Sequence, residues 1–288
     1  MRVTHVMDAA QFLARTATFR ATEPLLTNVI STVTEGVLAG RDYEAAHWWI
    51  IEDDESSGSH QADPTRVVGV AMRTVPYNLV LSPMPQQAAE MLSDEVCGLF
   101  PQLSGVSAPK DVGQWFLARH YAAVARVGIR MHDVIRVLAE FLPAHGVSGL
   151  ARAVTDSDRP MLQGWMTQFA QDAGVHAFGA DAAVQGLLER GWLWQSEEGP
   201  VSVCGHTTIT GSVGERVVRV GPVFTPLEFR GHGYASAITS HVISLLQPQA
   251  ETVMLYADAN NPTSNGVYER LGMPIVAEII EWELSYAD

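Results

Sequence analysis

The segment from Arg230 to Ala235 has the composition of a loop that binds phosphate groups. It reads Arg-Gly-His-Gly-Tyr-Ala and lies between a valine-rich segment, 217–225, and an amphipathic segment that begins near residue 234. A strand that leads through a glycine-containing turn directly into a helix leaves the first N–H groups of that helix without acceptors. These N–H groups and the positive end of the helix dipole predict a site for a pyrophosphate.

The spacing of this loop differs from that of two other phosphate-binding loops. It lacks the Gly-x-Gly-x-x-Gly of dinucleotide-binding folds and the Gly-Lys-Ser/Thr that ends a P-loop. It fits Arg/Gln-x-x-Gly-x-Gly/Ala, and together with residues 220–226 it resembles the pyrophosphate loop of the GNAT superfamily of acyl-CoA-dependent N-acyltransferases. The residues alone also allow a strand-to-helix turn whose glycines only permit close packing.

A second resemblance to the same superfamily lies further along the chain. A segment typical of a strand, 252–257, is followed by Asn-Pro-Thr-Ser-Asn over 261–265 and then by Tyr268. The resemblance implies that Asn261 holds the end of a splayed strand and touches the pantetheine arm, and that Asn265 lies beside the cofactor. It also implies that Tyr268 faces the sulfur, whereas the residue type alone indicates a half-buried helix tyrosine.

The resemblance implies that acetyl-CoA is the acyl donor substrate and that no metal takes part. Contacts with it are expected from the end of the strand, the glycine loop, the start of the next helix and two asparagines. These residues are Val223, Phe224, Thr225, Arg230, Gly231, His232, Gly233, Tyr234, Ala235, Ser236, Asn261 and Asn265.

The expected reaction is the transfer of an acetyl group to a primary amine by direct attack, through a tetrahedral intermediate and without a covalent enzyme intermediate. A backbone N–H within 223–225 would polarise the thioester carbonyl. Tyr268 is the expected catalytic residue, which would protonate the departing thiolate or donate a hydrogen bond to it. The acceptor is expected to be a small-molecule or peptide amine, and its identity stays open because loops build acceptor sites.

The group that removes the proton from the amine is not identified by the sequence. At pH 7 the neutral form of a lysine-like amine is disfavoured by about 4 to 5 kcal/mol, so a base or a desolvating pocket matters. Segment 217–224 contains no carboxylate, while His206 and Glu215 lie near it in the sequence. Both are candidates, and loss of the proton to water is an alternative.

Two other classes of function remain open from the sequence. A protein with the same loop could bind acyl-CoA as an effector and catalyse nothing, acting as a sensor or regulatory protein. In a purely structural protein both halves would be scaffold, and coenzyme A would not bind at all. The presence of Tyr268 in its expected place favours the enzyme.

The segments around the loop predict the elements that position it. Ala235, Ile238, Val242 and Leu245 recur at helical spacing and form one apolar stripe, and Pro248 ends this helix. The order strand, helix, strand, helix predicts a crossover unit with two parallel neighbouring strands. In the superfamily these strands splay apart to admit the pantetheine arm.

The order of elements in the second half of the chain repeats that of the first half. We expect an α/β fold with two GNAT-like domains, each a mixed, partly splayed β-sheet flanked by helices. A composition break near residue 145 divides a degenerate domain, 1–145, from an acyl-CoA-binding acetyltransferase domain, 146–288. Segment 82–87 of the first half has two prolines and no glycine, so the pyrophosphate loop is missing there.

The individual elements follow from periodicity and from turn residues. In the first half we expect helices over 8–40, a strand over 47–52, a polar loop over 52–64, strands over 65–73 and 78–82, helices over 86–99 and 112–126, and a strand over 127–137. In the second half we expect strands over 149–153, 192–196 and 201–210 and helices over 161–173 and 182–190, before the segments described above.

Composition and charge exclude several partners. The net charge of −14 and a single lysine, Lys110, argue against nucleic acid, which needs clustered cations. The absence of a long apolar run predicts a cytoplasmic protein without a membrane span. Cys97 and Cys204 lack partners at metal-binding spacing and are expected to be reduced, buried thiols. The oligomeric state does not follow from the sequence.

Overall fold

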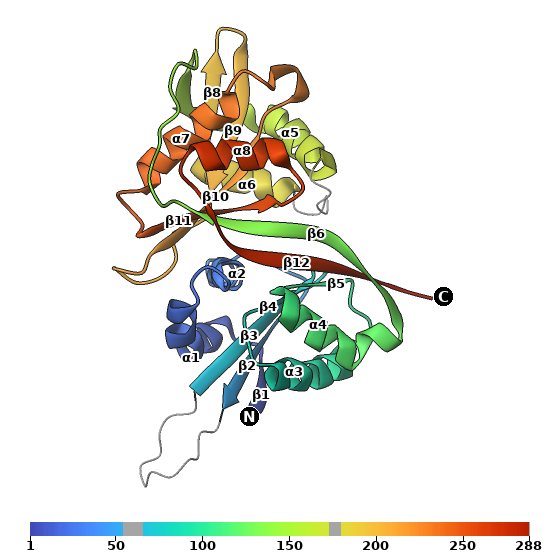
Figure 1. Cartoon of the computed structure of the whole chain (residues 1–288). Helices are drawn as coiled ribbons and strands as arrows, with labels where there is room; N and C mark the ends of the chain where they lie inside the picture. The colour runs from blue at the N-terminus through green and yellow to red at the C-terminus, as the bar shows by residue number, and fades with distance from the viewer. Residues whose placement is uncertain (54–65, 173–179, 288) are drawn as a thin grey trace. The chain divides into compact units, whose positions relative to one another are not determined.

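The structure is a computed structural model that describes residues 1–53, 66–172 and 180–287 (Figure 1). The chain forms two compact units, of which unit 1 contains Met1–Asp133 and the segment from Glu278 onward, and unit 2 contains Val134–Ala277. Each unit has a mixed β-sheet with helices on both faces, which confirms the predicted α/β class.

The helices and strands occur in the same order along both halves of the chain, as the predicted duplication requires. The first set is β1 (Arg2–Val6), α1 (Ala9–Thr22), α2 (Asn28–Leu38), β2 (Ala46–Asp53), β3 (Arg66–Thr74), β4 (Leu79–Leu81), α3 (Gln86–Leu99), β5 (Gly105–Ala108), α4 (Lys110–Arg119) and β6 (Ala125–Val137). The second set is β7 (Leu150–Ala153), α5 (Arg159–Asp172), α6 (Ala180–Arg190), β8 (Gly191–Ser196), β9 (Gly199–His206), β10 (Val217–Phe224), α7 (Tyr234–Leu246), β11 (Thr252–Asp258), α8 (Pro262–Arg270) and β12 (Ile275–Tyr286).

The sheet of unit 1 separates two apolar cores. Consecutive side chains of a strand point to opposite faces, so Trp48 and Ile50 of β2 pack with α1 and α2, while Trp49 and Ile51 pack with α3 and α4. Figure 1 shows these two pairs of helices on opposite sides of β2 and β3. Because both faces are covered, β2 is almost entirely buried.

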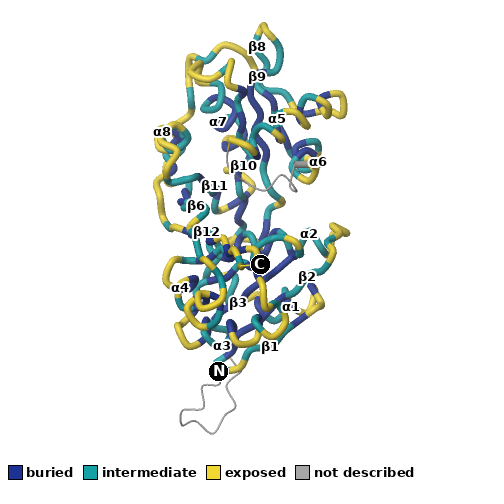
Figure 2. The backbone as a smooth tube through the Cα atoms, turned by 90° about the vertical axis from the view of Figure 1, so that its right-hand side faces the viewer, coloured by how far each residue is buried: buried dark blue, intermediate teal, exposed yellow. Residues whose placement is uncertain are grey.

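Unit 2 is layered in the same way. One face of its sheet packs against α7 and α8 through residues that include Val218 and Leu255. The other face packs against α5 and α6 through Leu193, Val203 and Phe224. Figure 2 shows the strands of this sheet as mostly buried and the turns that connect them as exposed.

Most of the predicted elements are present. The structure also contains three short or terminal strands that the sequence did not predict. The predictions missed β1, β5 and β12, and the expected helix over 112–126 ends at Arg119. The strand β5 is a four-residue segment of Gly, Val, Ser and Ala, whose composition is only weakly typical of a strand. Of the expected polar loop over 52–64, residues 54–64 lie outside the described residues.

The division between the units differs from the boundary that the composition break near residue 145 indicates. The strand β6 begins in unit 1 and its last residues, from Val134, belong to unit 2, while β12 from Glu278 onward belongs to unit 1. There β12 pairs antiparallel with β5, with Ile280 opposite Ala108 and Trp282 opposite Val106. Burial of Trp282 in the core of unit 1 explains this exchange, because strand pairing and side-chain packing act together.

Two tryptophans of unit 2 and the two cysteines lie where packing accounts for them. Trp192 and Trp194 are half-buried and pack against the core beneath α7 and α8. Cys204 is fully buried and Cys97 is half-buried, and both are free thiols. Among the described residues, no helix has the length and apolar character needed to cross a membrane.

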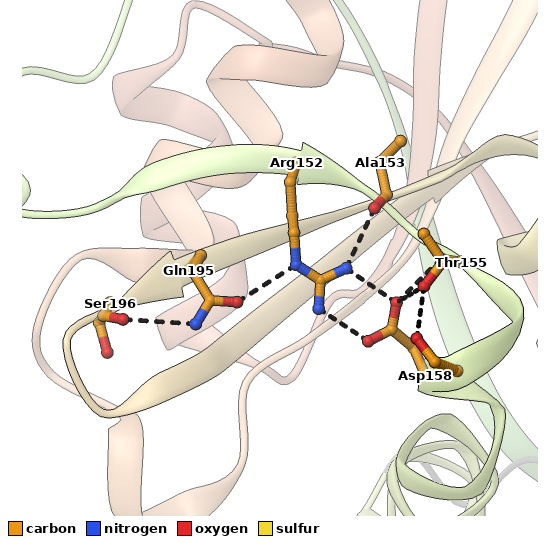
Figure 3. Close-up of polar contacts among 7 residues, drawn as sticks. Arg152, Ala153, Thr155, Asp158, Gln195 and Ser196 are labelled. Atoms are coloured by element: carbon orange, nitrogen blue, oxygen red, sulfur yellow. Dashed lines mark hydrogen bonds and ion pairs between the residues drawn. The ribbon is translucent and has the colours of Figure 1, made fainter.

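A partly buried ion pair fixes the segment that leads into α5 (Figure 3). The guanidinium of Arg152 donates from Nη2 to Asp158 Oδ1 over 2.7 Å and from Nη1 to Asp158 Oδ2 over 2.8 Å. The amide N–H of Thr155 also donates to Asp158 Oδ2, over 2.8 Å. These hydrogen bonds, with that from Arg152 first in importance, lower the pKa of the Asp158 carboxyl from 3.8 to about 2.

Replacing Asp158 by Asn should lower the free energy of unfolding by about 2 kcal/mol at pH 7, because folding favours the charged carboxylate by nearly that amount. Folding lowers this pKa, so the stabilisation is complete above about pH 5 and is lost as the pH falls towards 2. Urea titrations of both proteins at pH 7 and near pH 3 measure the difference.

The matched control is Asp156→Asn, two residues earlier in the same turn. The side chain of Asp156 is 93% exposed and lies 3.6 Å from Arg159. It should change the free energy of unfolding by less than about 0.5 kcal/mol. Equal effects of the two substitutions would contradict the role of Asp158.

Candidate functional site

The parallel strands β10 and β11 separate soon after they meet. Their register contains Val217 with Thr252, Val218 with Val253 and Arg219 with Met254, and it ends there. The parallel pairing confirms the predicted crossover unit. From residue 220 onward β10 pairs only with β9 on its other side, so an edge opens between β10 and β11.

The end of β10 is held by β9 rather than by β11. An irregularity in register lies between Val220 and Val223, after which Val223 faces Cys204. Ser202 of β9 donates a hydrogen bond from Oγ to the carbonyl of Phe224 over 3.0 Å, and its Oγ lies 2.8 Å from Oγ1 of Thr225. The predicted thioester-contacting residues, 223–225, are thereby fixed on one side and lie beside the opened edge on the other.

Unpaired N–H groups gather where β10 gives way to α7. The N–H groups of residues 231–236 have no acceptor among the described residues, whereas that of Ala237 donates to the carbonyl of Gly233 over 3.0 Å. The first N–H groups of a helix cannot bond within it, and those of the preceding turn extend the same row. Successive unpaired N–H groups at a helix N-terminus are an arrangement that binds anions in other proteins.

Two glycines give this turn its shape. Gly231 and Gly233 have φ values of 84° and 81°, in the left-handed region that favours glycine. A Cβ at Gly231 would meet no atom within 4 Å, whereas a Cβ at Gly233 would lie 3.1 Å from Val147 Cγ2. The space beside Gly231 is therefore open, whereas Gly233 packs closely against Val147.

The two basic side chains of the loop make contacts within unit 2. Arg230 donates from Nε to the carbonyl of Thr225 over 3.0 Å, and its Nη2 lies 2.6 Å from Asp172 Oδ2 at the end of α5. His232 stacks on Tyr234 with ring centroids 5.5 Å apart. Arg230 thus ties the loop to the end of β10 and to α5, while its half-exposed side chain remains near the donors.

The two predicted asparagines organise the start of α8. Asn261 is the N-cap, and its side chain accepts a hydrogen bond from the N–H of Ser264 over 3.1 Å. Asn265 donates from Nδ2 to the carbonyls of Asp258 and Asn261, over 2.8 and 2.9 Å. Both residues join the end of β11 to α8, which is the positioning part of the role that the resemblance implies.

Tyr268 lies on the same face of α8 and is 8% exposed. Burial raises the pKa of its hydroxyl far above the ordinary value, so it keeps its proton throughout the physiological range. Cys204 lies close enough to influence it, and burial raises the pKa of that thiol to about 12. A thiol held in the neutral form is a poor nucleophile, which agrees with a reaction that forms no covalent link to cysteine.

Arg136 of β6 is a site residue that the sequence did not reveal. Its side chain is 4% exposed, donates from Nε to Asn265 Oδ1 over 3.0 Å and donates from Nη1 to the carbonyl of Met273 over 2.6 Å. Its charge also lowers the pKa of Tyr268, against the larger effect of burial. An arginine 129 residues before its partner leaves no local pattern that could have indicated this contact.

The two candidate bases occupy different places. Glu215 precedes β10, whereas the loop follows its end, and a strand of eight residues spans about 25 Å. His206 lies opposite Val220, and its Nδ1 is 2.8 Å from the carbonyl of Thr207, so Nδ1–H donates and Nε2 keeps its lone pair. Burial lowers the pKa of His206, which favours the neutral imidazole.

The corresponding turn in unit 1 is filled by side chains. Between β4 and α3, Met84 is buried and its Cβ would lie 2.7 Å from a Cβ placed on Gly69. Ser82 is fully buried and accepts a hydrogen bond from the N–H of Val70. The N-cap of α3 is Pro85, which has no N–H to offer.

Comparison with known proteins identifies the fold. Residues 208–280, which contain the loop and α8, match the family model described as FR47-like protein. An acetyltransferase of the GNAT family from Colwellia psychrerythraea has a TM-score of 0.60 at 8% identity, over 99% of this chain and 100% of its own. The chain has the fold of the GNAT superfamily. The comparison with curated proteins gives no match.

The GNAT fold extends over both units. A tandem GNAT protein from the clavulanic acid biosynthesis pathway has a TM-score of 0.56 at 12% identity, over 100% of this chain and 99% of its own. A GCN5-related N-acetyltransferase from Kribbella flavida has a TM-score of 0.54 at 14% identity, over 90% of this chain and 95% of its own. Within the ranges that the structure describes, no three His, Cys, Asp or Glu side chains are grouped to hold a metal ion.

Replacing Arg136 by Met should lower the free energy of unfolding by about 3 kcal/mol, because Asn265 Oδ1 and the Met273 carbonyl lose their buried donor. Urea denaturation measures this change. The matched control is Arg126→Met on the exposed part of the same strand, for which less than about 0.5 kcal/mol is expected. A change at Arg136 no larger than at Arg126 would show that the buried guanidinium does not support α8.

Proposed function

We propose that unit 2 is an N-acetyltransferase that uses acetyl-CoA and a primary amine. The observation that carries this proposal is the row of unpaired N–H groups over 231–236, placed directly beside the edge where β10 and β11 separate. The donors suit the diphosphate of coenzyme A, and the opened edge suits the extended pantetheine arm. The shared GNAT fold supports the same assignment.

Bound acetyl-CoA would supply the thioester carbonyl that the amine attacks and the thiolate that leaves. In that step the protein would stabilise the negative charge that develops on the carbonyl oxygen and on the departing sulfur. A main-chain N–H within 223–225 would stabilise the carbonyl oxygen as it becomes negative. This segment keeps its position because Ser202 fixes Phe224 and Thr225 from the neighbouring strand.

Tyr268 would act on the departing sulfur. Burial holds its pKa above the ordinary tyrosine value, and a thiol has a lower pKa than even an unperturbed tyrosine. Complete transfer of the proton to the thiolate is therefore uphill, whereas a hydrogen bond to the thiolate is favourable. We assign to Tyr268 the donation of that hydrogen bond, with Arg136 and Asn265 keeping α8 in position.

The amine must reach the thioester in its neutral form. His206 is neutral at pH 7 and has a lone pair on Nε2, so it is the better placed of the two candidate bases; Glu215 lies beyond the other end of β10. The surplus of acidic residues, with a net charge of −14, favours the approach of a cationic amine at low salt. The acceptor class proposed is a small-molecule or peptide primary amine.

Gly231→Ala should weaken coenzyme A binding about ten- to a hundredfold. The added methyl group would occupy the open space beside the turn, and the strained backbone would misalign the main-chain N–H groups that donate to the diphosphate. Isothermal titration with coenzyme A measures this change. The matched control is Gly214→Ala, whose φ is 95° and whose Cβ would also meet no atom within 4 Å. Both variants carry similar backbone strain, so equal affinities would remove the loop from the site.

Tyr268→Phe should keep the affinity for coenzyme A and lower turnover about tenfold or more, because only the hydroxyl that meets the leaving thiolate is lost. A thiol-release assay with acetyl-CoA and a panel of amines measures this, with Tyr43→Phe of unit 1 as the matched control. Unchanged turnover would exclude Tyr268 from the mechanism. Saturable binding without thiol release from any amine would favour an acyl-CoA sensor.

A further inference from the structure

Unit 1 contains a buried arginine that forms no ion pair with any described carboxylate. Arg73, on β3, is 8% exposed, and its Nε and Nη1 are inaccessible and without a hydrogen-bond partner. It forms no ion pair with any described residue, and no carboxylate is among the charges that act on it. The other buried arginine of the described chain, Arg136, donates two hydrogen bonds.

One aromatic ring lies against this guanidinium, and two more pack against that ring. Its carbon Cζ lies 4.2 Å from the centre of the Phe100 ring, which caps the end of α3. The His47 ring meets the same Phe100 ring edge-on at 5.0 Å, and Trp49 lies 6.3 Å from it. The contact of a cation with an aromatic ring offsets only part of the free energy that burying an unpaired charge costs.

The surroundings provide further hydrogen-bond donors. His5 Nε2 lies 3.0 Å from His47 Nδ1, so one ring donates to the other. In either tautomer arrangement, one of the two remaining ring nitrogens carries a hydrogen. Trp49 Nε1–H is buried and also has no partner among the described residues.

The strand register explains why these groups meet. His47 lies opposite Arg73, and Trp49 lies opposite both Ala71 and His5, so all of them share one face of the sheet at the end where β2 begins and β3 ends. Burial lowers the pKa of both histidines, and Arg73 adds to this effect at His47. The charge of Glu95 raises the pKa of His5 against the larger effect of burial, and no carboxylate acts on Arg73 itself.

We propose that this group of residues, His5, His47, Trp49, Arg73 and Phe100, binds the carboxylate of a small aromatic anion. Nη2 is the one guanidinium nitrogen of Arg73 that the surrounding residues leave accessible, so it offers the first contact. The carboxylate would accept one charge-assisted hydrogen bond from Nη2, and a flat aromatic body would lie against the neighbouring rings of this group. The site lies wholly within unit 1, and its occupation is independent of the acetyltransferase function proposed for unit 2.

The test is a titration of the full chain with benzoate, followed by calorimetry and by thermal unfolding. Benzoate should bind and raise the melting temperature, whereas the neutral analogue benzamide should not. Arg73→Met should weaken benzoate binding about ten- to a hundredfold, as loss of a charged hydrogen bond predicts. Arg66→Met, at the exposed start of the same strand, is the matched control and should bind benzoate as the wild type does.

Other outcomes decide against the proposal. If the protein binds inorganic phosphate but not benzoate, the group is a phosphate site and not a carboxylate site. If benzoate and benzamide bind equally well, the site does not recognise the negative charge. If neither anion binds and Arg73→Met is more stable than the wild type, the arginine is only packed against Phe100. Should Arg73→Met fail to fold, Arg73→Gln keeps a polar end without the charge and should still lose most of the affinity for benzoate.

Discussion

The main-chain donors at the start of α7 are the constraint on which the rest of unit 2 depends. They remain unpaired because the turn at Gly231 and Gly233 directs them to one side and because α7 cannot use them. Ser202 holds the end of β10, Arg230 ties the loop to Thr225, and Asn265 holds the start of α8. The surrounding hydrogen bonds therefore hold these donors in place, where the diphosphate of the proposed cofactor would meet them.

The sequence predicted those features of this arrangement that depend on residues close together in the chain. The glycine turn, the apolar stripe of α7 and the N-cap Asn261 each involve residues within a few positions of one another. The contact of Arg136 with Asn265 joins residues 129 positions apart, and neither residue type indicates the other. The roles of β5 and β12 were missed for the same reason, since their pairing rests on Trp282 entering a core that is otherwise built from the first half of the chain.

The two units share one fold but differ in their turns and strand ends. Both have a pair of parallel strands joined through a helix, β4 with β5 and β10 with β11. In unit 2 the turn before the helix is rich in donors, whereas in unit 1 Met84 and Pro85 occupy the corresponding turn. Unit 1 instead has a buried guanidinium, that of Arg73, near the end of β3 and over the Phe100 ring. Residues in the loops and at the strand ends, and not the strands themselves, distinguish the units.

The placement of β12 in unit 1 has a consequence for how the protein is made. About 145 residues separate the end of the first segment of unit 1 from Glu278, and a ribosome adds roughly 5 to 20 residues per second. The edge of β5 that receives β12 is therefore left unpaired for on the order of ten seconds on each nascent chain. During that time another strand can occupy it, so neighbouring nascent chains on one message compete with the chain's own final strand.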